Sequence, residues 1–188
     1  MRACLSSGFP RRVATALSWL ALWLGLAATA MAATGGIVLK LDVSGKVIAC
    51  DARADFDAAR IARVLGEGTQ VGVDWDIEVA AVRRYWLDAT LAEVTVKRRV
   101  RPDLVSRSWL LMDETTGITR RVFDVREAVR FLVRLDHFPV LDRSLLEHAR
   151  PYRMTVTARK TEGDAERGWL ATWLGRGSLE ASAVFSLP

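Results

Sequence analysis

The chain has 188 residues, with 27 Lys and Arg against 22 Asp and Glu, and 51% of its residues are hydrophobic. Three of the 27 basic residues lie in the first 32 positions, which leaves 24 basic against 22 acidic residues beyond them. This near balance argues against nucleic-acid binding. The length after position 32 suits one globular domain, so we expect a single domain over residues 33–188.

The first 32 residues have the pattern of an export signal. Three arginines precede an apolar stretch, residues 13–29, that contains no charged residue, and the run Ala30-Met31-Ala32 offers small residues for cleavage. We therefore expect cleavage after residue 32 and a periplasmic location. The alternative is an uncleaved anchor in the inner membrane, because the apolar stretch approaches the roughly 20 residues that span a bilayer.

Two strands and a helix are predicted at the start of the domain. Residues 37–43 and 47–51 alternate as strands do, and the connection between them contains Gly45, which suits a hairpin. Asp55 or Asp57 can then cap a helix that ends at residue 65, because apolar residues recur at three- and four-residue spacing before a glycine.

Residues 71–80 give the clearest strand pattern, with one apolar and one acidic face, and residues 92–101 pair an apolar face with a basic one. Antiparallel pairing of Trp75 with Val100 brings acids opposite bases. The same register pairs Val79 with Val96, Asp76 with Arg99, Asp74 with Arg101 and Glu78 with Lys97. We therefore interpret the three acids as a solvated cross-strand ladder rather than as metal ligands or an acid/base pair.

The second half of the domain is predicted to contain two hairpins and one strong helix. Strands are expected over residues 105–112 and 118–123, and Asp124 begins a helix whose apolar stripe reaches Leu135. A connector over residues 141–149 leads to two final paired strands, which begin near Tyr152 and Leu179. The pattern predicts an α+β fold, mainly antiparallel β, with a sandwich-like sheet and two or three short helices.

Several of these segments resemble one known family. The run over residues 71–88 contains Trp75-Asp76-Ile77-Glu78-Val79 and then Arg83-Arg84-Tyr85-Trp86-Leu87-Asp88. Together with later segments, it resembles the bacterial domain-of-unknown-function family 4390 over roughly residues 55–160. The later segments are Asp103-Leu104, Ser108-Trp109-Leu110-Leu111, Glu127-Ala128, Leu132, Pro139-Val140, Leu146 and Tyr152. The resemblance implies a signal-bearing envelope protein, with a membrane signalling protein as one class of partner, and it supplies no catalytic residue.

Two surfaces are candidates for partner binding. Arg126, Arg130 and Arg134 recur every four residues and are expected on the helix face away from its apolar stripe. Trp169 and Trp173 lie one helical turn apart, each followed by a leucine, and predict a short amphipathic element. A solvated arginine face and a docked tryptophan pair are the alternative interpretations.

The remaining reactive residues do not form a catalytic or metal-binding pattern. His137 and His148 lack the spacing of a zinc site, and Cys50 stands in an apolar run that indicates a small core residue. We therefore expect no cofactor, no metal and no catalytic residue. The leading hypothesis is a noncatalytic periplasmic protein-interaction domain. The alternatives are an enzyme with an active site assembled from distant acids and a protein that binds an anionic lipid surface.

Overall fold

Two antiparallel sheets build the domain in the computed structural model, which describes residues 36–85, 87–163 and 177–187. A three-stranded sheet has the order β1-β2-β7, made of Ile37–Asp42, Val47–Ala54 and Arg134–Asp142. A six-stranded sheet has the order β6-β5-β4-β3-β8-β9, made of Ile118–Val122, Ser108–Asp113, Ala89–Asp103, Val71–Ala81, Pro151–Glu162 and Ser178–Ser186. The helices are α2 (Ala58–Gly66) and α3 (Val125–Val133), and η2 is a short 3-10 turn at Arg143–Leu145.

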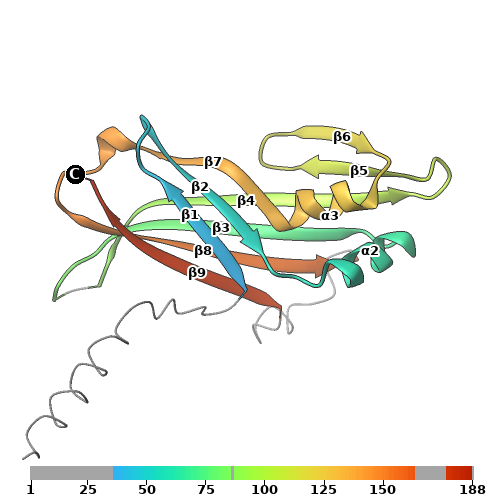
Figure 1. Ribbon diagram of the computed structural model, residues 1–188, viewed down its shortest axis with the longest axis horizontal. Helices are drawn as coiled ribbons and strands as arrows, with labels where there is room; N and C mark the ends of the chain where they lie inside the picture. Colours follow the sequence, from blue (N-terminus) through green and yellow to red (C-terminus); the bar gives the residue numbers. More distant parts are fainter. Residues whose placement is uncertain (1–35, 86, 164–176, 188) are drawn as a thin grey trace, which may run out of the picture. The chain divides into compact units, whose positions relative to one another are not determined.

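The predicted sandwich-like α+β fold is confirmed. The three-stranded sheet lies over one face of the six-stranded sheet (Figure 1), and β1 runs beside β9 where the two layers meet. The two helices continue the layer of the smaller sheet, since α2 follows β2 and α3 leads directly into β7. No helix in the described residues is long and apolar enough to cross a membrane.

The core lies between these layers, and the strand alternation explains which side chains enter it. On β3 the odd-numbered residues are buried and the acidic ones face outward. Trp75 is fully buried, and its indole Nε1 donates a hydrogen bond to the carbonyl oxygen of Leu132 at 3.1 Å. The central strand is thereby fastened to α3. Cys50 is also buried, as expected, and burial raises the pKa of its thiol to about 11.

The predicted antiparallel pairing of β3 with β4 is correct, but the predicted register is wrong. Trp75 lies opposite Val96 rather than Val100, and Val79 lies opposite Ala92 rather than Val96. Every partner is therefore displaced by four residues along β4. An even displacement leaves each side chain on the same face of the sheet, so the alternation of apolar and charged residues cannot distinguish the two registers.

Two of the three acids of β3 still pair with bases, although all three expected partners change. Asp74 lies opposite Lys97 and forms an ion pair with Arg99 at 2.6 Å, and Asp76 forms an ion pair with Arg159 of β8. Glu78 lies opposite Glu93 and accepts a hydrogen bond from a threonine side chain. Because β3 is a central strand, the neighbour on its other side supplies a base that pairing with β4 alone does not provide.

The boundary after α3 also differs from the prediction. The helix was expected to carry an apolar stripe as far as Leu135, but it ends at Val133, and Leu135 belongs to β7. Leu135 is nevertheless fully buried, because a strand that leaves the helix can direct the same side chain into the core. Strand β7 begins at the end of the expected helical stripe, covers only the first two residues of the expected connector, and pairs with β2. The N-caps Asp57 and Asp124 are confirmed.

Candidate functional site

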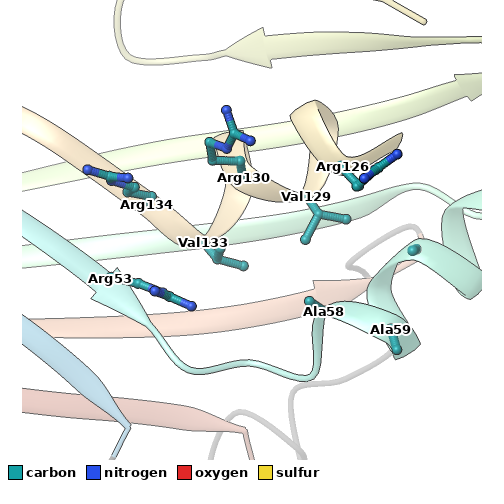
Figure 2. A pocket seen from close by; sticks show the side chains of 9 residues that line it. Arg53, Ala58, Ala59, Arg126, Val129, Arg130, Val133 and Arg134 are labelled. Carbon is teal, nitrogen blue, oxygen red and sulfur yellow. The ribbon is translucent and has the colours of Figure 1, made fainter. Parts of the chain in front are cut away.

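A groove of about 490 Å³ lies between α2 and α3, next to the end of β2 and the start of β7 (Figure 2). It combines an apolar floor with positively charged side chains. Its lining residues are Arg53, Ala58, Ala59, Ala62, Arg126, Val129, Arg130, Val133 and Arg134. Such a lining can hold an anionic group and an apolar group together, because the charge and the floor lie side by side.

Small side chains on α2 open this groove. Ile61 and Leu65 turn into the core and are fully buried, which leaves three alanines on the side of α2 that faces α3. Figure 2 shows Val129 and Val133 on the facing side of α3, with the four arginines placed around them. Alanine leaves space where a larger residue would fill the gap between two packed helices, so the groove follows from the local sequence.

Two arginines of the groove stand directly opposite each other. Arg53 of β2 and Arg134 of β7 are register partners in the three-stranded sheet. Like charges opposed across two strands destabilise a sheet by up to roughly 1 kcal/mol. Arg134 forms an ion pair with Asp136 beside it, whereas no acid of the described residues lies within ion-pair distance of Arg53. This arrangement concentrates positive charge at the groove.

The two helical arginines add to that charge. The side chain of Arg126 is 88% exposed and lies 3.7 Å from Asp124, the N-cap of its own helix. Arg130 is exposed, and within the described ranges no carboxylate is close enough to form an ion pair with it. Exposed ion pairs such as that of Arg126 with Asp124 contribute little free energy, so Arg126 can exchange Asp124 for an acid of a ligand.

The structure therefore brings together the three arginines that the sequence singled out, although not on one helix. Arg126 and Arg130 lie on α3 as expected, but Arg134 stands in β7, because the helix ends one residue earlier. It still lines the groove, since β7 continues directly from the helix. Sequence reasoning missed Arg53. Its contribution depends on the pairing of β2 with β7, which no local pattern reveals.

The other candidates contribute less to this site. Trp169 and Trp173 lie outside the described residues. His137 belongs to β7, where its backbone N–H donates to a carboxylate oxygen of Asp51 at 2.8 Å. In the described part of the chain, no group of three or more His, Cys, Asp or Glu residues could hold a metal ion.

Comparison with known proteins identifies the family. A family model described as a domain of unknown function, DUF4390, matches residues 38–165, which is more than half of the chain. No curated protein and no solved structure matches the chain. The matched residues include β3 with the following loop and α3, on which the resemblance in the sequence rests. The chain therefore belongs to the DUF4390 family.

Proposed function

We propose that this protein is a noncatalytic interaction domain of the periplasm, and that its arginine-lined groove binds an acidic segment of an envelope protein. The supporting observation is the lining of the groove, in which four arginines surround an apolar floor without a carboxylate. The export pattern of residues 1–32 is the basis for the compartment. A membrane signalling protein with an acidic periplasmic segment is one class of partner with this chemistry.

The groove favours a peptide segment whose carboxylates alternate with small apolar side chains. Guanidinium groups bind carboxylates through paired hydrogen bonds, and four of them around one groove can hold more than one acid. The alanines and valines of the floor offer contact to apolar side chains. The lining contains no group that can take up a proton near neutral pH, so it is suited to binding rather than to acid/base chemistry.

The opposition of Arg53 and Arg134 predicts an effect on stability as well as on binding. Removing Arg53 relieves its repulsion with Arg134, so Arg53→Gln should leave the free protein as stable as the parent or up to about 1 kcal/mol more stable. A side chain that destabilises the folded protein but strengthens the binding of a ligand is typical of a functional site.

The test uses a fluorescently labelled peptide in which Glu alternates with Leu and Ala, measured by anisotropy. The double variant Arg53→Gln with Arg130→Gln should bind it about tenfold or more weakly, because each lost guanidinium removes a charge-assisted hydrogen bond. The charge-matched control is Arg63→Gln with Arg101→Gln, two exposed arginines that do not line the groove. It should bind like the parent.

Equal losses in the groove variant and in the charge-matched control would show that binding follows net charge and would contradict a specific groove. Absence of binding to the parent at low salt would also contradict the proposal. If anionic vesicles rather than the peptide lost affinity with the double variant, the groove would instead bind a lipid surface.

A further inference from the structure

The loop between β3 and β4 exposes apolar side chains at the end of the sheet opposite α2 and α3 (Figure 1). Tyr85 is 84% exposed and Leu87 is 91% exposed. Arg83 and Arg84 directly precede them and are also exposed. Two large apolar side chains and two cations on one short loop form a small amphipathic patch that a partner with apolar and anionic groups can cover.

The backbone around these side chains is held in place. The N–H of Val82 donates to the carbonyl oxygen of Pro151 at 3.0 Å, which fixes the loop to β8. At the other end, Asp88 accepts a hydrogen bond from the N–H of Arg83 at 3.2 Å and forms an ion pair with Arg153. The loop thus presents Tyr85 and Leu87 from an anchored base, which lowers the entropy lost on binding.

The guanidinium groups of Arg83 and Arg84 are available to bind an anion. Within residues 36–85, 87–163 and 177–187, no carboxylate lies within ion-pair distance of Arg83 or Arg84. The guanidinium of Arg84 lies 6.0 Å from the centre of the Tyr85 ring, so the cation and the aromatic side chain stand together. Arginine next to an aromatic and a leucine suits a membrane interface, where apolar groups enter the lipid and cations meet the headgroups.

We infer that this loop, through Arg83, Arg84, Tyr85 and Leu87, contacts an anionic membrane surface. The size of the patch favours lipid over protein, because a stable protein interface buries about 800 Å² on each partner, far more than two exposed side chains provide. A lipid surface needs only a few inserted side chains, and basic residues near it add attraction to anionic headgroups. The loop and the groove share no residue, so this inference can fail while the proposed function stands.

The experiment labels the loop itself, in the full chain with Cys4→Ser. Leu87→Cys carries an environment-sensitive fluorophore, and Cys50 escapes labelling because it is buried in the core. Vesicles of phosphatidylcholine mixed with phosphatidylglycerol should raise the emission about twofold or more, with a shift to the blue, as the label enters the interface. The response should fall with added salt and with Arg83→Gln plus Arg84→Gln.

The matched control places the same label at Val105→Cys, a residue that is 98% exposed in the β4–β5 connection at the other end of the sheet. It should not respond, even if residues 1–32 hold the chain at the vesicle. A second control, Arg63→Gln with Arg101→Gln, removes the same charge outside both the loop and the groove and should leave the response at position 87 unchanged. No response at position 87, an equal response at position 105, or a response insensitive to the two loop arginines would overturn the inference.

Discussion

Arg98 places a largely buried guanidinium against the end of a helix. It lies on the inner face of β4, and its guanidinium Nη1 donates to the carbonyl oxygens of Phe131 at 2.9 Å and Arg134 at 2.6 Å. The guanidinium also stacks 4.7 Å from the centre of the Phe131 ring. Carbonyls at the end of a helix lack partners within the helix and carry partial negative charge, so a cation there is stabilising.

The surroundings of Arg98 both disfavour and stabilise its positive charge. Burial lowers its pKa, while the nearby Asp113 carboxylate, 3.6 Å from Nε, acts in the opposite direction. Nε itself is buried without a hydrogen-bond partner in the described residues, since 3.6 Å is too long for one. The arginine is therefore held by the helix end and the phenylalanine ring more than by its acid.

Replacing this residue should be costly. Arg98→Met keeps much of the side-chain length but leaves two carbonyl oxygens and Asp113 without their cation, so we expect a loss of about 3 kcal/mol in the free energy of unfolding. Urea denaturation measures it. The control is Arg101→Met on the exposed outer face of the same strand, which should change stability by less than about 0.5 kcal/mol. Similar losses for the two variants would contradict the role assigned to Arg98.

At the scale of elements, the amino-acid pattern predicts most strands and both helices but not how they align. The alternation in β3 and the caps at Asp57 and Asp124 are local properties, and both agree with the structure. Register is not local, because a displacement by an even number of residues preserves every face. Strand β7 escaped prediction for a related reason: its apolar residues follow a helical stripe without a break, and its pairing with β2 joins segments far apart in the chain.

The groove shows the same division between local and distant information. Four-residue spacing correctly placed Arg126 and Arg130 on one helix, since helical periodicity is a local property. Arg53 could not be found, because its neighbours in space come from α3 and β7. An inner-face arginine such as Arg98 is equally hidden, since it is one of three consecutive charged residues in the strand sequence.

A double-mutant cycle tests the corrected register. Asp76 forms its ion pair with Arg159 of β8, so Asp76→Asn and Arg159→Gln should show a coupling energy of about 0.2–1 kcal/mol. The same cycle between Asp76 and Arg99, the partner expected from the sequence, should give a coupling near zero, because Arg99 pairs with Asp74. Stronger coupling of Asp76 to Arg99 than to Arg159 would instead support the register predicted from the sequence.

At the scale of the whole molecule, β3 occupies the most protected position. It pairs with β4 on one side and β8 on the other, and Trp75 at its centre donates a hydrogen bond to a backbone carbonyl of α3. Strand β6, by contrast, is a five-residue edge strand whose side chains are exposed at all positions but Val122. The molecule should therefore open first at β6 and last at β3.

Amide hydrogen exchange checks this order. Amides of β3 should exchange only when the whole domain unfolds, whereas those of β6 should exchange roughly a hundredfold or more faster through local opening. A mild denaturant series separates the two routes, because only global unfolding depends strongly on its concentration. Equal protection in both strands would contradict the expected order and would indicate that the edge opens only together with the core.

The exposed edge of β6 has a consequence for how copies of the protein behave toward one another. An unpaired strand edge is a template on which a second chain can add, and long edges of this kind lead to aggregation. Strand β6 is short and carries Arg120 and Arg121 at its centre. An edge-to-edge pair formed by two copies would bring these cations close together. Their repulsion therefore opposes the growth of fibres from the folded domain.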